Sequence, residues 1–107
     1  MIARGPETLP AFAEALKNPD HNVREDVVRA LPRFGPPALP VLAIASHDPD
    51  VRVQRSTVAA LAAVGMPARR LLRTIADTSE HDSIALAARR ALVQVAAASR
   101  RSAHASP

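Results

Sequence analysis

The sequence contains no cysteine, tryptophan or tyrosine, and its two phenylalanines are the only aromatic residues among 107. The absence of cysteine excludes a disulfide-bonded scaffold, cysteine-ligated zinc, an iron–sulfur cluster and a cysteine nucleophile. The scarcity of aromatic rings argues against a base-stacking nucleic-acid site and against an aromatic cage for a cation. Lysine is nearly absent too, since thirteen of the fourteen basic residues are arginine.

Long apolar runs are also missing, and none approaches the length of a membrane span. Residues 1–5 contain no apolar signal core. We therefore expect a cytoplasmic protein with no membrane partner. Hydrophobic residues make up 48% of the chain, which is typical of a globular protein, and the length fits one domain with a modest core.

The net charge of +4 is unevenly distributed. Residues 1–50 hold five cations and seven acids, which gives −2, whereas residues 51–107 hold nine cations and three acids, which gives +6. The basic second half supports one alternative, a nucleic-acid-binding module. Proteins that bind phosphate usually carry more lysine in a denser cluster, so the partner we expect is an acidic protein segment.

A pattern with a period of about thirty residues runs through the chain. Asn18-Pro19-Asp20 recurs as Asp48-Pro49-Asp50, and in a third copy Ser79-Glu80-His81 replaces this turn. An Ala-Leu dipeptide recurs at offsets of 30 and then 31 residues: Ala30-Leu31, Ala60-Leu61 and Ala91-Leu92. Agreement of many positions at one offset predicts a repeat architecture.

Each copy predicts two helices, and the second carries the clearer apolar face. Those faces comprise Val23, Val27, Ala30, Leu31 and Phe34, then Val53, Thr57, Ala60, Leu61 and Val64, then Ile84, Ala88, Ala91, Leu92 and Val95. Asp20 and Asp50 precede two of these helices and are expected to cap them, while Gly35 and Gly65 are expected to end them. Pro32 predicts a kink or an early helix end near residues 28–32.

The first helix of each copy is predicted over residues 7–17, 37–46 and 67–77. Pro10 and Pro40 fall within a first turn, where a missing N–H is tolerated. The side chains expected to be buried are Phe12, Leu16, Leu42, Ala45, Leu72 and Ile75.

The predicted fold is an all-α, right-handed solenoid of three helix pairs, about six helices, because a two-helix repeat cannot bury both its faces alone. It forms one domain over residues 5–97, with repeats at approximately 5–34, 35–64 and 65–97. Leu31, Leu61 and Leu92 should form the most buried row. Residues 98–107 carry no large apolar side chain and are expected to fray.

The Pro-started helix, the Asp-Pro-Asp turn and the following V-R…A-L…G pattern resemble the HEAT repeat, in particular the short bacterial HEAT-like kind known from PBS lyases. The best copy runs from Asn18 to Arg24 and continues with Ala30-Leu31 and Gly35. In the second copy the arginine is displaced, and the third lacks the proline, the capping aspartate and the glycine. The resemblance implies that the second helices line a concave side and that the protein is a non-catalytic interaction scaffold or adaptor.

Some branches of this family are enzymes or assist enzymes, which leaves a lyase- or hydroxylase-related subunit as a further alternative. The deoxyhypusine-hydroxylase branch holds two irons with His-Glu pairs, whereas this chain has only the reverse order, Glu80-His81. A base-excising glycosylase branch uses aromatic residues and an acid in a cleft. No glycine-rich phosphate loop or recognisable triad is present. We therefore predict no catalytic residue and no cofactor.

Three histidines fall in the turns between paired helices, near aspartates: His21, His47 and His81. One interpretation is a His/carboxylate metal site, and the other is a set of solvated turn residues. Because the histidines do not occupy equivalent repeat positions, we predict no metal site.

Five arginines lie off the apolar spacing of the second helices: Arg29, Arg33, Arg55, Arg89 and Arg90. The repeat register predicts that they share one face and bind an acidic protein segment there. The alternative is a solvated face, partly neutralised by Glu25 and Asp26.

The outer end of the first repeat is expected to be poorly capped. Its first helix offers Ala11, Ala13, Ala15 and Leu16 with few charges, although a terminal repeat should be polar outside. Gly5-Pro6 also copies the junction between repeats. We expect this end to meet another subunit or a preceding repeat.

Overall fold

The computed structural model describes residues 8–105, with side chains through residue 101. The described chain contains no strand, and its helical segments follow one another in pairs. They are α1 (Leu9–Ala15), α2 (His21–Ala30), η2 (Leu31–Phe34), η3 (Pro36–Ala38), α3 (Leu39–Ala45), α4 (Val51–Val64), η4 (Met66–Ala68), α5 (Arg69–Thr78) and α6 (Asp82–Ala105). The η segments are short 3₁₀ helices. The predicted repeat start at residue 5, the helix start at 7, the Gly5-Pro6 junction and the last two tail residues lie outside the described residues.

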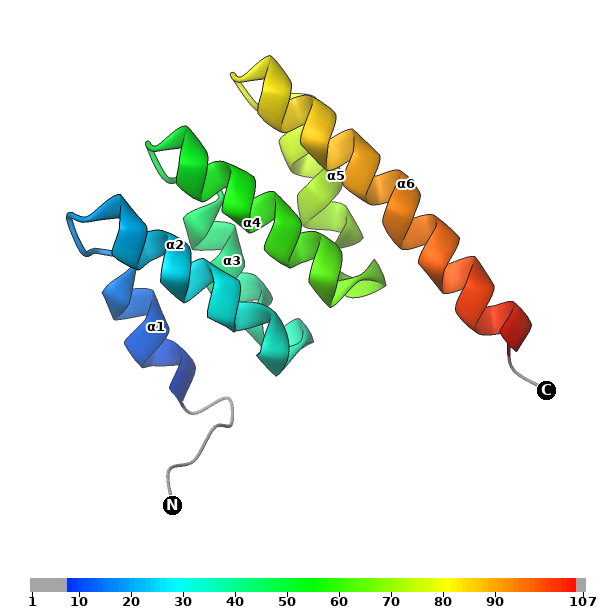
Figure 1. Ribbon diagram of the computed structural model, residues 1–107, viewed down its shortest axis with the longest axis horizontal. Helices are drawn as coiled ribbons and strands as arrows, with labels where there is room; N and C mark the ends of the chain where they lie inside the picture. Colours follow the sequence, from blue (N-terminus) through cyan, green and yellow to red (C-terminus); the bar gives the residue numbers. More distant parts are fainter. Residues whose placement is uncertain (1–7, 106–107) are drawn as a thin grey trace.

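The six α-helices form two layers. Figure 1 shows α2, α4 and α6 side by side in one layer, with α1, α3 and α5 behind them. Within the front layer α2 packs against α4, and α4 packs against α6. The molecule measures 44 × 41 × 17 Å, so its smallest dimension fits two helices, each about 10 Å thick. This arrangement confirms the predicted all-α solenoid of three helix pairs.

The helix ends follow the predicted capping chemistry. Asp20 Oδ1 accepts a hydrogen bond from the N–H of Asn22, and Asp50 Oδ1 accepts one from the N–H of Arg52, both at 2.8 Å. Each bond satisfies a first-turn N–H that has no partner within its helix. At the other ends Gly35 and Gly65 have φ values of +69° and +93°. Residues that carry a side chain rarely adopt these backbone angles, which explains why glycine occupies both positions.

Pro32 ends the regular part of the second helix early. The α-helix α2 stops at Ala30, and the chain continues as the 3₁₀ helix η2. Proline has no N–H to bond the carbonyl of Val28, and that carbonyl instead accepts from the N–H of Leu31. The equivalent Ala62 lies inside α4, which runs unbroken to Val64. The predicted early end near residues 28–32 is confirmed.

The predicted first helices begin with 3₁₀ turns in the second and third pairs. Regular α-helix starts only at Leu39 and Arg69, after η3 and η4. Pro10 and Pro40 lie at the start of α1 and α3, as predicted. The six side chains expected to be buried from these helices are buried, except Phe12, which is half-buried and packs edge-to-face on Phe34 with ring centres 5.5 Å apart.

The core runs along the interior of the stack. Leu31 and Leu61 are fully buried, as predicted, but Leu92 at the same repeat position is only half-buried. No described helix pair packs on the far side of α6, so the leucine of the last pair has neighbours on one side only. The prediction for Leu92 was therefore wrong.

The last helix is longer than the repeat predicts. It continues to Ala105, through most of the stretch where we expected fraying. Alanine and arginine favour helix, and no glycine or proline interrupts residues 82–105, so the sequence has no stop signal there. Fraying of this stretch stays a prediction. No helix in the described chain combines the length and apolarity needed to cross a membrane.

Candidate interaction surface

The side chains that point away from the core on α2, η2, α4 and α6 form a single face, which we call the second-helix face. The turns fix its register: Asn18 Oδ1, Asp48 Oδ1 and Ser79 Oγ each accept from the N–H two residues later, at 2.8, 2.9 and 3.2 Å. Equivalent residues thus lie 30 and then 31 positions apart. The rows across the face are Glu25, Arg55 and Leu86; Arg29, Ala59 and Arg90; Pro32, Ala62 and Val93; and Arg33, Ala63 and Gln94.

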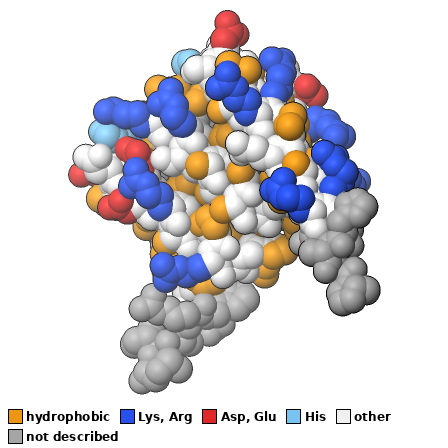
Figure 2. All heavy atoms as spheres, turned by 45° about the vertical axis from the view of Figure 1, so that its right-hand side comes forward, with side chains coloured by type: hydrophobic (Ala, Val, Ile, Leu, Met, Phe, Trp, Pro, Cys, Tyr) orange, Lys and Arg blue, Asp and Glu red, His pale blue; other side chains and the backbone are white. Residues whose placement is uncertain are grey.

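Three arginines of this face form no ion pair with any residue that the structure describes. They are Arg33 from the first helix pair, Arg55 from the second and Arg90 from the third, and all are exposed. Figure 2 shows Lys and Arg side chains spread around one side of the molecule, with hydrophobic and uncharged groups between them. These three arginines are therefore separated from one another, mostly by uncharged side chains.

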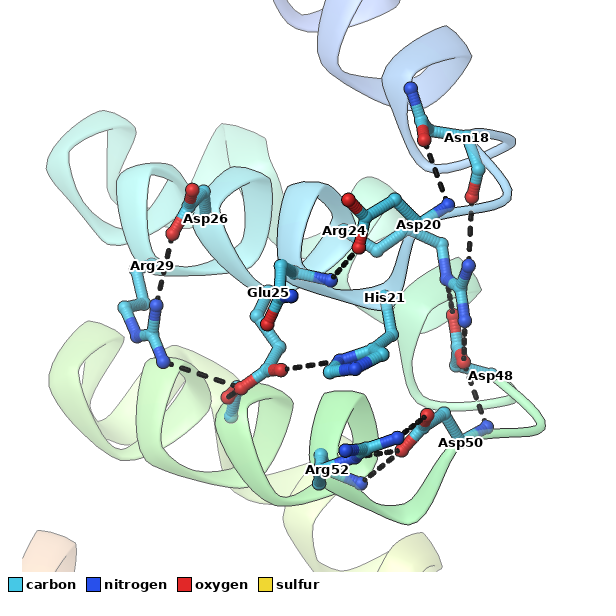
Figure 3. A network of polar contacts seen from close by, with 12 residues as sticks. Asn18, Asp20, His21, Arg24, Glu25, Asp26, Arg29, Asp48, Asp50 and Arg52 are labelled. Atoms are coloured by element: carbon cyan, nitrogen blue, oxygen red, sulfur yellow. Dashed lines mark hydrogen bonds and ion pairs between the residues drawn. The ribbon is translucent and has the colours of Figure 1, made fainter.

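Arg29 lies on the same face, but acids neutralise it. Its guanidinium lies 3.0 Å from Asp26 and 3.3 Å from Glu25 (Figure 3). Glu25 also lies 2.9 Å from Nδ1 of His21 and accepts a 3.5 Å hydrogen bond from Ser56 on α4. Arg29 therefore fits the alternative of a solvated, neutralised face better than it fits a binding role.

Arg89 does not share this face, contrary to our expectation. Val28 and Val58 occupy its repeat position and are buried because they face the next helix pair. Arg89 is exposed on that same flank of α6, and its Nη2 donates to the carbonyl oxygen of Ala76 on α5 at 3.3 Å. Helical spacing shows that a residue lies outside the buried apolar face of its helix, but it does not show on which side of that face the residue lies.

A second polar site, which the sequence did not reveal, joins the turns of the first two helix pairs. Arg24 Nε and Nη2 donate to the carboxylate of Asp48 at 2.8 and 3.2 Å, and Nη1 donates to the carbonyl oxygen of Asn18 at 2.7 Å (Figure 3). The side chains of Arg24 and Asp48 are only 12% and 7% exposed. The hydrogen bond to Asp48 raises the pKa of Arg24 further. The available signal was Arg24 within the repeat motif, but nothing in the motif indicates its partner.

The equivalent contact is missing between the second and third helix pairs. Gln54 replaces Arg24, and its Nε2 donates to the carbonyl oxygen of Asp48 at 2.7 Å. This hydrogen bond matches the one from Arg24 to the carbonyl of Asn18 within the first pair. In the next turn, however, Ser79 takes the position of Asp48, so that position carries no carboxylate. A hollow of about 360 Å³ lies here, lined in part by Gln54, Ser79 and His81.

The cap of α4 carries its own ion pair. Arg52 donates from Nε and Nη2 to the two oxygens of Asp50 at 3.0 and 2.8 Å. These side-chain bonds, followed by the bond from the Arg52 backbone N–H, hold the pKa of Asp50 far below its ordinary range. The same pairing raises the pKa of Arg52.

The lowered pKa of Asp50 predicts a loss of stability in acid. A carboxyl group with a lowered folded-state pKa contributes fully above the ordinary value of about 4, and this contribution is lost as the pH falls below it. Asp50→Asn should therefore lower the melting temperature at pH 7, and the difference from the parent should shrink toward pH 2. Asp77→Asn, at an exposed position, is the matched control and should change little at either pH. A constant effect of Asp50→Asn across this range would contradict the assignment.

The three turn histidines do not converge. His21 contacts Glu25, whereas His47 and His81 line the hollow near Gln54. Among the described residues, no three His, Asp or Glu side chains lie close enough together to hold a metal ion. The histidines therefore provide no argument for metal chemistry here.

Comparison with known families agrees with this geometry. The family model described as HEAT repeats matches residues 9–93. No curated protein matches the chain significantly. Since the family match runs from the start of α1 into α6, it includes all three helix pairs, and the chain belongs to the HEAT-repeat family.

Proposed function

We propose that this chain is a non-catalytic interaction module of the cytoplasm that binds an acidic protein segment on its second-helix face. HEAT repeats are generally protein-interaction scaffolds and are typically non-enzymatic. The observation that carries the proposal is a set of exposed arginines that form no ion pair within the described part of the chain: Arg33, Arg55 and Arg90, one from each helix pair. A carboxylate-bearing partner that spans the three pairs would find a charge on each of them.

The centre of the face allows close approach by a partner. Ala59, Ala62 and Ala63 lie on α4 between the arginines of the flanking helices. Because alanine side chains are short, a docked segment can come close to the backbone of α4. The longer arginine side chains on either side can then contact the sides of that segment. Leu86 and Val93, 45% and 68% exposed, add apolar area along the edge of α6. The partner we infer is therefore a segment with both carboxylates and apolar side chains.

Nucleic acid remains the alternative, supported by the basic second half of the chain. The arginines there are divided between the two layers, however. Arg69, Arg70 and Arg73 lie on α5, whereas Arg55 and Arg90 lie on the opposite layer. A phosphate backbone is best bound by a continuous basic track, which this division does not provide.

The test measures binding of two labelled probes by fluorescence anisotropy. One is a helical peptide rich in Glu and Leu, and the other is a DNA duplex. We expect the peptide to bind more tightly at physiological salt. Arg55→Glu combined with Arg90→Glu should weaken peptide binding by about tenfold or more, because two attractive contacts become repulsive.

Arg70→Glu combined with Arg73→Glu is the matched control, because it changes the net charge equally on α5. It should leave peptide affinity within about twofold, and both double variants should keep the parent's helical content and melting temperature. Equal weakening by the two double variants would mean that net charge, not this face, drives binding. Tighter binding of the duplex, with a steep linear dependence on log salt, would favour the nucleic-acid alternative.

A further inference from the structure

The N-terminal edge of the stack exposes positions that are buried within it. Phe12, Val23 and Ala30 are half-buried there. Their counterparts in the second and third helix pairs are buried by the preceding pair: Leu42 and Leu72, Val53 and Ile84, and Ala60 and Ala91. Leu16, which we expected at the outer end, is itself buried. The apolar surface of this edge therefore comes from Phe12, Val23 and Ala30, and it has the composition of an interface between helix pairs.

The C-terminal edge shows the complementary half of the same interface. Leu92 is half-buried where Leu31 and Leu61 are fully buried. Leu86 and Val93 belong to this edge of α6 and are two of the three large hydrophobic side chains exposed among the described residues. The two ends thus present the two sides of a junction that the chain builds twice internally.

Each edge also carries one charged residue where the internal junctions have an uncharged one. At the N-terminal edge Asp26 takes the position of Ser56 and Ala87. At the C-terminal edge Arg89 takes the position of Val28 and Val58. Both side chains are exposed, and their charges are opposite.

The internal register predicts where these two residues would meet. The Ser56 hydroxyl contacts Glu25 across the first junction, which sets position 56 beside position 25 of the preceding pair. If two copies pack in this same register, Asp26 of one copy lies beside Leu86 of the other. Arg89, one helical turn further along α6, then lies next to Asp26 and Ala30.

We propose that the chain associates head to tail with a second copy of itself, with the α6 edge of one molecule against the α1–α2 edge of the next. The charge difference between the two halves, −2 for residues 1–50 and +6 for residues 51–107, attracts the ends in this orientation and repels the like ends. Breaking the ion pair between Asp26 and Arg29 costs little free energy, because both side chains are exposed. Each molecule joined in this way still has a free edge for another copy, so the interface produces a concentration-dependent series of oligomers. This inference does not rest on the proposed function, although Leu86 and Val93 lie where the second-helix face meets the C-terminal edge.

Sedimentation velocity of the full chain, from micromolar to millimolar concentration, tests the proposal. We expect the parent to form oligomers that weaken as salt is raised, because the contact between Asp26 and Arg89 is screened. Asp26→Arg and Arg89→Asp should each raise the dissociation constant by about tenfold or more while leaving the melting temperature at low concentration unchanged. An equimolar mixture of the two variants should associate again, because an unaltered edge of each meets an unaltered edge of the other.

A parent that stays monomeric at every concentration would overturn the proposal. Variants that associate as strongly as the parent would overturn it too. The same holds for an equimolar mixture that associates as weakly as each variant alone. Because the chain has no cysteine, crosslinking gives a second measurement that does not depend on charge. Asp26→Cys and Arg89→Cys proteins, mixed and oxidised, should form the mixed disulfide dimer in preference to either homodimer. A random distribution of the three dimers would count against the head-to-tail contact.

Discussion

Leu61→Ala should lower the free energy of unfolding by about 2–5 kcal/mol, the range for truncating a large side chain in a packed core. Leu61 is fully buried in α4, the central helix of the front layer, which packs against both α2 and α6. A cavity there removes packing contacts from the core that α4 shares with its neighbours. Because a domain of this size has a total stability of about 5–15 kcal/mol, the variant should be close to unfolding at ambient temperature. Urea denaturation followed by circular dichroism measures the change.

Ile44→Ala is the matched control for this prediction. Ile44 is also a large aliphatic residue in a helix, but it is 56% exposed. Its truncation should change the free energy of unfolding by less than about 0.5 kcal/mol, as is usual on the surface. Similar losses for the two variants would mean that the assigned repeat register is wrong.

Asp48→Ala should lower the free energy of unfolding by about 3 kcal/mol, the lower end for breaking a buried ion pair. The change leaves the guanidinium of Arg24 without its carboxylate in a mostly buried position, and it removes the acceptor for the N–H of Asp50. Urea denaturation at pH 7 measures the loss. Arg24→Met combined with Asp48→Leu should recover part of it, because the double variant leaves no buried charge without a partner.

Glu14→Ala shows whether the effect of Asp48 depends on burial. Glu14 forms an ion pair with Lys17 at 3.1 Å, but both side chains are more than 70% exposed. Breaking such a pair changes stability by about 0–1 kcal/mol. If Asp48→Ala had no larger effect than Glu14→Ala, the junction between the first two pairs would depend on packing alone.

The architecture was predictable because each local signal in the sequence points to the same fold. Aspartate caps, glycine ends, proline starts and apolar spacing all repeat at one offset, and Asp20, Asp50, Gly35 and Gly65 play the predicted roles. Local chemistry determines these features, so no knowledge of distant contacts is needed.

The errors concern neighbours that a local pattern does not contain. The burial of Leu92 depends on whether another helix pair lies beyond α6, and the flank on which Arg89 lies depends on the packing of α5 and α6. The contact between Arg24 and Asp48 joins residues 24 positions apart. A repeat motif shows that an arginine recurs or is lost, but it does not show which carboxylate that arginine reaches across a junction.

The replacement of Arg24 by Gln54 at the second junction makes the molecule mechanically uneven. The first two helix pairs are linked by charged hydrogen bonds at the turn, in addition to helix packing, so they should move as one stiff unit. The third pair lacks that link beside the hollow lined by Gln54 and Ser79, so bending should concentrate between α4 and α6. A segment bound as we propose would then meet a fixed spacing from Arg33 to Arg55 and an adjustable spacing from Arg55 to Arg90, which would allow the face to fit partners of different curvature.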